Sequence, residues 1–96
     1  MITRLVKLTI QPTRYREFIA LYSQAQKQIR LFDGCVGLEL LHDASKSNIV
    51  FTISKWKTEN DLNGYRNSEF FVNVWNSVKP MFEEKAEAWS LKSAGN

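Results

Sequence analysis

The spacing of apolar residues changes between two periods along this chain, and the order of those changes constrains its fold more than any other feature. An apolar residue at every second position is typical of a β-strand, whereas one at every third or fourth position is typical of an amphipathic helix. The strand period occurs in four segments, residues 2–10, 35–42, 48–56 and 85–92. The helical period occupies residues 13–28 and the segment that begins after Thr58.

Residues that start and stop helices divide the second helical segment. Thr58 is a favourable N-cap, and acidic residues follow it in the first turn, where the helix dipole favours negative charge. Gly64 and Asn67 interrupt the helix, and Ser68 can cap a second piece. Pro80 lacks a backbone N–H, so we expect the helix to end just before it.

The resulting order, β-α-β-β-α-β, predicts a single α+β domain over residues 1–96. We expect a ferredoxin-like antiparallel sheet with both helices on one face. Simple alternation places His42 on the same face as three apolar residues of its strand, Val36, Leu38 and Leu40.

Strands two and three carry apolar residues on both faces, and in strand three Phe51 faces opposite to Val50. In the last strand, Trp89 and its apolar neighbour Leu91 face opposite to Ala88. One helix layer covers one face, and a second subunit would cover the other. The composition agrees, because three Trp, three Tyr and six Phe in 96 residues exceed what a thin core needs. We therefore expect a homodimer.

Composition and charge also narrow the cellular setting. The single Cys35 cannot form an intrachain disulfide, which fits a reducing compartment. No leader pattern precedes the first strand, and no apolar run approaches the roughly 20 residues of a membrane span, so we expect a cytoplasmic protein without a membrane partner. Lys55 and Lys57 flank Trp56, but basic and acidic residues are interspersed, which favours solvated charge over nucleic-acid binding.

Three features of the sequence resemble the antibiotic biosynthesis monooxygenase superfamily of dimeric α/β barrels. The Phe-Asp-Gly-Cys run at residues 32–35 is similar to the family's turn into strand two. Trp56 matches the tryptophan that ends strand three, and the family's three-residue steps follow it at Leu62, Tyr65, Ser68 and Phe71. The resemblance implies a homodimer whose two sheets face each other, with a pocket between helices and sheet in each subunit. Known members oxygenate phenols, quinols or anthrones without a cofactor, or bind and degrade haem.

The chain departs from several family motifs. Haem-degrading members have an asparagine, a tryptophan and a haem-ligating histidine at the positions of Val6, Tyr65 and Trp75. Indole cannot ligate iron, so haem degradation is disfavoured. Quinol-type members often have a histidine where Tyr65 stands and a glutamate where Ser54 stands, and cofactor-free oxygenases can use an asparagine at the position of Asp61. We therefore expect no cofactor.

Three residues are candidates for catalysis. Tyr65 could orient a phenolic substrate or assist proton removal, and the alternative is an amphipathic core tyrosine with its hydroxyl at the rim. Asp61 could be a base if it is desolvated, and the alternative is a solvated acid of the first helical turn. His42, the only histidine, could be a general base or a structural residue at a strand end, and a multi-histidine metal site is excluded.

Aromatic residues are expected to form the wall of a substrate site: Trp56, Phe71 and Trp75. Two functions follow from the sequence. The first is a cofactor-independent monooxygenase of a small aromatic substrate; the second is a non-catalytic dimeric binding or regulatory module. Empty volume beside Tyr65 separates them, because a cavity filled by Phe71 and Trp75 would exclude the enzyme.

Overall fold

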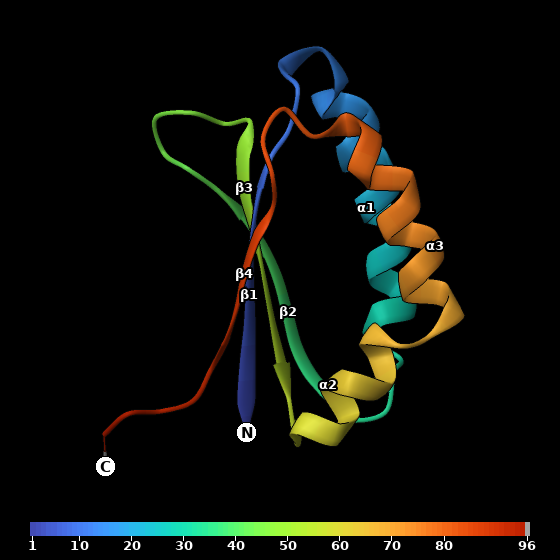
Figure 1. Ribbon diagram of the computed structural model, residues 1–96, viewed down its shortest axis with the longest axis vertical. Coiled ribbons are helices and arrows are strands. Elements are labelled where there is room, and N and C mark those ends of the chain that lie inside the picture. The colour runs from blue at the N-terminus through green and yellow to red at the C-terminus, as the bar shows by residue number, and fades with distance from the viewer. Residues whose placement is uncertain (96) are drawn as a thin grey trace.

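The computed structural model describes residues 1–95, and its four strands form one antiparallel sheet in the order β2-β3-β1-β4. The elements are β1 (Ile2–Thr9), α1 (Tyr15–Ile29), β2 (Cys35–His42), β3 (Ile49–Trp56), α2 (Glu59–Arg66), α3 (Glu69–Val78) and β4 (Glu87–Leu91). All three helices cover the same face of the sheet (Figure 1). The predicted ferredoxin-like β-α-β-β-α-β order is confirmed, with α2 and α3 together as its second helix.

The entry into α1 differs slightly from the prediction. The paired part of β1 ends at Thr9, and Ile10 forms only an isolated bridge with Phe82. A 3-10 turn, η1 (Pro12–Arg14), then precedes α1, because proline suits the first turn of a helix and its missing N–H removes it from the sheet. The buried stripe of α1 contains Phe18, Ala25 and Ile29.

The predicted caps are confirmed, and the helix breaks at Asn67 as expected, but Gly64 lies inside α2 and does not interrupt it, because a single glycine lowers helix stability without ending the helix. Thr58 Oγ1 accepts a hydrogen bond of 3.1 Å from the backbone N–H of Asp61 and caps α2. Ser68 Oγ accepts one of 3.1 Å from the backbone N–H of Phe71 and caps α3. Pro80 lies in a closing 3-10 turn, η2 (Lys79–Met81), so the α-helix ends where expected. The Ser68 cap, two residues after α2 ends at Arg66, therefore starts α3.

A bulge at the start of β2 corrects the predicted faces of this strand. Cys35 pairs with Trp56 and Gly37 pairs with Lys55, so one extra residue lies between them. The extra residue is Val36, which is 46% exposed and does not share the buried face of Leu38. Simple alternation fails here because a bulge reverses the parity of every residue before it.

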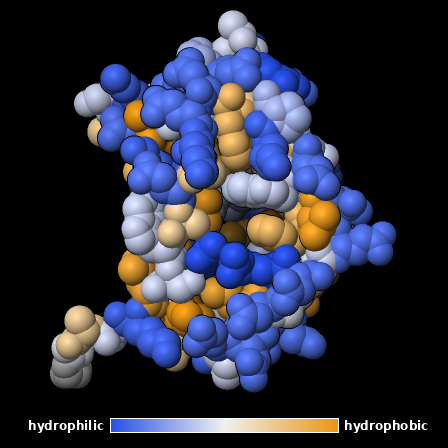
Figure 2. Space-filling model, viewed as in Figure 1, coloured by the Kyte–Doolittle hydropathy of each residue, from blue (hydrophilic) through white to orange (hydrophobic). Residues whose placement is uncertain are grey.

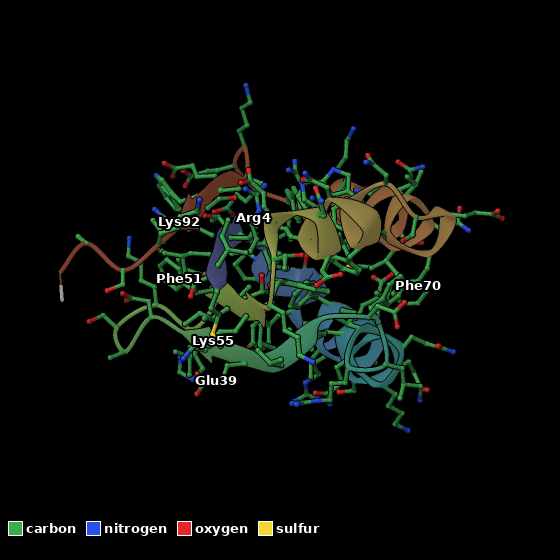
Figure 3. All side chains as sticks on the ribbon, turned by 90° about the horizontal axis from the view of Figure 1, so that it is seen from below. Arg4, Glu39, Phe51, Lys55, Phe70 and Lys92 are labelled. Atoms are coloured by element: carbon green, nitrogen blue, oxygen red, sulfur yellow. The ribbon has the colours of Figure 1, made fainter. Side chains whose placement is uncertain are left out.

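Two groups of buried side chains fill the space between sheet and helices. One surrounds Trp56, whose side chain is completely buried, and the other surrounds Phe18 and Val50. On the opposite face of the sheet, residues 1–95 place no helix (Figure 1). Phe51 extends from that open face, away from the helices (Figure 3). Among the described residues, no helix has the length and apolar character that crossing a bilayer requires.

Candidate functional site

A cavity of about 320 Å³ lies between the sheet and the helices. Its floor comes from the helix side of the sheet, including Val6, Leu8 and Thr52, and its roof from α1, α2 and α3. Figure 2 shows this face of the molecule hollowed between the sheet and the helices, with strongly hydrophilic residues along the lower edge of the opening. The volume is near the lower end of the roughly 300–1,000 Å³ range of ligand pockets, so it suits a small molecule.

Tyr65 lines this cavity from α2 and is held by three aromatic neighbours. Its ring stacks on Trp56 with centroids 5.0 Å apart and meets Phe32 and Phe71 edge-on, each at 5.1 Å. Burial raises the pKa of the Tyr65 phenol above its usual range, and the nearby Tyr22 adds to the shift. The phenol is therefore protonated at neutral pH and acts as a hydrogen-bond donor, not as a base.

Tyr22 reaches the same cavity from α1. Its hydroxyl oxygen is inaccessible to solvent and has no hydrogen-bond partner among the described residues. Burial raises the pKa of this phenol to about 12, although the charge of Arg30 opposes the shift. A buried hydroxyl without a partner is costly, so a ligand that displaces the packing around it and accepts its hydrogen bond would remove that cost. Sequence periodicity marks Tyr22 only as part of the buried stripe of α1.

The predicted aromatic wall is only partly at the cavity. Phe71 and Trp75 line it and stack on each other with centroids 6.0 Å apart, while Phe82 meets Trp75 edge-on at 5.5 Å. They leave the space beside Tyr65 open. Trp56 does not line the cavity; it lies behind Tyr65, where its Nε1–H donates a 2.9 Å hydrogen bond to the Ser54 hydroxyl.

The two predicted proton acceptors are placed elsewhere. Asp61 lies in the first turn of α2 against Gly34, and a β-carbon at that glycine would overlap the Asp61 side chain. His42 is exposed at the end of β2, with Nδ1 2.9 Å from the Asp43 carbonyl oxygen. Neither residue lines the cavity, and their catalytic roles remain predictions. Tyr65 is the one predicted catalytic residue that lies at the cavity.

Two arginines at the cavity are absent from the sequence-based candidates. Arg4 on β1 and Arg66 at the end of α2 both line it. Arg4 has the same strand parity as Val6 and Leu8, and that is the sequence signal that could have placed it on the helix side. Arg66 had no such signal, because its position depends on how α2 crosses the sheet.

The chemistry available at the cavity follows from its lining. Protonated phenols and guanidinium groups supply hydrogen-bond donors among apolar and aromatic walls. Of the described residues that line it, none is an aspartate, glutamate, histidine or cysteine. Within residues 1–95, no three such side chains gather in a way that could hold a metal ion. The site can therefore orient and desolvate a ligand and donate to an oxygen atom of it.

Comparison with known proteins gives a family and a fold. The family model described as antibiotic biosynthesis monooxygenase matches residues 1–89. A conserved protein from Methanosarcina mazei Go1 is similar in structure, with a TM-score of 0.90, 18% identity and coverage of 96% of this chain and 92% of the other. A structure described as an antibiotic biosynthesis monooxygenase has a TM-score of 0.92 and 15% identity, covering 99% and 100%.

A third similar structure is the N63A mutant of SnoaB from Streptomyces nogalater, described as a cofactor-independent oxygenase. Its TM-score is 0.87 at 15% identity, with coverage of 99% of this chain and 94% of the other. No curated protein matches the sequence significantly. At such low identities, the structural matches bear on the fold alone.

Proposed function

Because the chain belongs to the antibiotic biosynthesis monooxygenase family, we propose that it is a cofactor-independent monooxygenase of a small aromatic substrate of the phenol, quinol or anthrone type. The observation that carries this proposal is the open cavity of about 320 Å³ beside Tyr65. Phe71 and Trp75 wall that space instead of filling it. SnoaB, which has the same fold, is described as a cofactor-independent oxygenase, and this description supports the proposed type of reaction.

In the proposed reaction, the substrate itself reduces oxygen. An anthrone or quinol loses a proton, and its anion passes an electron to O₂. The resulting radicals combine, and the peroxide then loses water to leave a carbonyl, so that one oxygen atom enters the product and the other leaves as water. The hydroxyl groups of Tyr22 and Tyr65 would donate hydrogen bonds to the substrate oxygen on which negative charge develops.

Raised pKa values suit the two tyrosines to this role. Both phenols keep their protons at neutral pH, because burial disfavours their ionised forms. The apolar walls exclude water and strengthen these hydrogen bonds. Since no carboxylate or imidazole of the described residues lines the cavity, we assign the departing proton to water at the mouth.

Oxygen consumption tests the proposed reaction. Anthrone and a naphthohydroquinone would be supplied to the protein and to two variants, Tyr65→Phe and Tyr15→Phe. Tyr15 is on α1 but does not line the cavity, so its substitution controls for loss of a tyrosine hydroxyl elsewhere. We expect Tyr65→Phe to lower kcat by roughly 10²-fold, as loss of one preorganised donor does elsewhere, and Tyr15→Phe to leave it unchanged. If oxygen consumption with the wild-type protein is no faster than without protein, the proposed monooxygenase activity is refuted.

One observation favours a second function, a non-catalytic small-molecule-binding or regulatory module. The part of the cavity lining that the structure describes lacks a group that could accept a proton at neutral pH. In that case, an anthrone or quinol would bind in the cavity, as judged by NMR shifts of Tyr65 and Trp75, while oxygen uptake stayed at the background rate.

We also propose a homodimer in which the open faces of two sheets meet as an α/β barrel. The open face carries large apolar side chains that no helix covers: Leu41 is 46% exposed, Trp89 41% and Leu91 43%. Strand register places Trp89 opposite Leu5, which lies between β3 and β4 on this face. Large apolar side chains exposed together on one sheet face are typical of a subunit interface.

Light scattering after size exclusion tests the dimer. We expect the wild type at twice the mass of the 11.2 kDa chain and Trp89→Lys at the mass of one chain, because a buried unpaired charge opposes association. Leu31→Lys is the matched control, since Leu31 is 79% exposed but lies in the turn after α1, away from the sheet face. A wild type of single-chain mass at micromolar concentration would refute the dimer.

A further inference from the structure

The cavity carries two arginines that the proposed oxidation does not use. Arg4 extends from β1 toward the helices and α2 (Figure 3), and Arg66 is the last residue of α2. Arg4 is half-buried, whereas Arg66 is exposed. Both side chains line the cavity, Arg4 from the sheet and Arg66 from the helix layer, and they are near enough for the charge of Arg66 to act on Arg4.

Neither guanidinium has a carboxylate partner among residues 1–95. The ion pairs of this part of the chain join other groups: Lys7 with Glu87, Arg14 with Glu17, and Lys92 with Glu59. Arg4 Nη1 donates a 2.9 Å hydrogen bond to the hydroxyl of Ser90, its direct partner on β4, and this bond leaves the other N–H groups of Arg4 available.

Two like charges next to an apolar cavity are unfavourable in the free protein. Burial lowers the pKa of the Arg4 guanidinium, and the charge of Arg66 lowers it further. An anion between the two groups would reverse this repulsion and accept charge-assisted hydrogen bonds from both. The ordinary alternative is a pair of solvated arginines that contribute only to solubility.

A second feature of the cavity lining also indicates a polar ligand. The Tyr22 ring lines the cavity and its hydroxyl is buried and unpartnered, so a ligand oxygen that displaces the packing around this hydroxyl could accept its hydrogen bond. Between these polar groups, the lining is aromatic and aliphatic, with Phe18, Phe71 and Trp75 among it. The complementary ligand therefore has an aromatic body, an anionic group at the arginines and an oxygen that reaches a tyrosine.

We propose that the cavity binds an aromatic carboxylate, with its carboxylate held by Arg4 and Arg66 and a ring hydroxyl directed to Tyr22. This names the substrate class of the proposed oxygenase, and so it rests on the same cavity as the proposed function. Guanidinium groups bind phosphate as well as carboxylate, often with two parallel hydrogen bonds. We choose the carboxylate because the small cavity leaves less room for a phosphate ester beside an aromatic body.

Calorimetric titration in the absence of turnover tests this class with three probes. They are 6-hydroxy-2-naphthoate, its neutral amide 6-hydroxy-2-naphthamide, and 2-naphthyl phosphate. We expect the naphthoate to bind at least ten-fold more tightly than the amide at neutral pH. Added salt should weaken the binding of the two anionic probes and leave the binding of the amide unchanged. Arg66→Gln and Arg4→Gln should each weaken naphthoate binding by ten-fold or more and leave the amide unchanged. Arg16→Gln removes the same charge from an exposed site on α1 and should change neither.

Several results would overturn the assignment. Equal affinity for naphthoate and amide, equal loss of both in Arg66→Gln, or no saturable binding of the naphthoate would each exclude an anion site. Tighter binding of the naphthyl phosphate would exclude the carboxylate class.

Measurements of oxygen uptake distinguish failure of the anion site from failure of the proposed monooxygenase activity. Arginine-dependent naphthoate binding without oxygen uptake from any quinol would support the anion site and refute the monooxygenase. The opposite result would be a rate of oxygenation of a neutral anthrone that is the same in wild type and Arg66→Gln, together with equal affinity for the naphthoate and its amide. It would support the monooxygenase and refute the anion site.

Discussion

Replacing Tyr22 with phenylalanine should stabilise the unliganded protein. The substitution keeps the ring, which stacks on Phe18 with centroids 6.2 Å apart, and removes only the hydroxyl. That hydroxyl oxygen is inaccessible to solvent and has no hydrogen-bond partner in the described residues. Burying an unpartnered hydroxyl costs about 1–3 kcal/mol, so we expect the free energy of unfolding of Tyr22→Phe to rise by that amount.

Urea denaturation at one fixed protein concentration measures this change, because association would make stability depend on concentration. In thermal unfolding, the same gain corresponds to about 4–8 °C in Tm for each kcal/mol in a domain of this size. Tyr15→Phe is the matched control on the same helix. Its hydroxyl is not a buried unpartnered group, so we expect a change within about 0.5 kcal/mol.

The gain in stability should be accompanied by a loss of binding. Without the Tyr22 donor, affinity for 6-hydroxy-2-naphthoate should fall by about ten-fold, because a hydrogen bond to a ligand oxygen is lost. A Tyr22→Phe protein less stable than wild type by 1 kcal/mol or more (roughly the value of one hydrogen bond) would refute the reasoning. It would mean that the hydroxyl has a partner in the free protein, such as water in the cavity.

Three further predictions concern stability. In urea denaturation, Gly34→Ala should destabilise the protein by more than about 1 kcal/mol, because Gly34 has φ +83° and a β-carbon would overlap Asp61. Gly64→Ala should stabilise it by up to about 1 kcal/mol, because Gly64 lies within a helix and has open space around it. Ser68→Ala should cost about 1 kcal/mol in the same assay, since it removes the cap of α3, and an unchanged midpoint would contradict that role. In alkaline solution, the free energy of unfolding of the wild type should fall as pH rises from about 10 to about 12, because Tyr22 ionises at a lower pH in the unfolded chain than in the folded one. The fall should be shallower in Tyr22→Phe, and parallel pH profiles of the two proteins would refute the raised pKa of Tyr22.

Local signals in the sequence predicted most of the fold. Strand and helix periods, and the caps at Thr58 and Ser68, depend on residues within a few positions of one another, so they could be read without tertiary information. The order of elements then determined the antiparallel sheet with helices on one face. The bulge at Val36 was missed, because nothing in the alternation of β2 marks an extra residue.

The candidate site was only partly predictable. Tyr65, Phe71 and Trp75 were identified from the sequence, and they do line the cavity. Asp61 and His42 were chosen for their chemistry, but chemistry alone does not state where a side chain lies, and neither lines the cavity.

Sequence patterns were enough to identify the residues that form strands, helices and caps, and the family that the chain resembles. It took the folded chain to bring Arg4, Tyr22 and Arg66, which are far apart in the sequence, to one cavity, and to place Trp56 behind Tyr65. The difference lies in the distance along the chain over which each interaction acts. Periods and caps act between near neighbours, whereas a cavity depends on how separate elements cross, and small changes in that packing decide which side chains reach it.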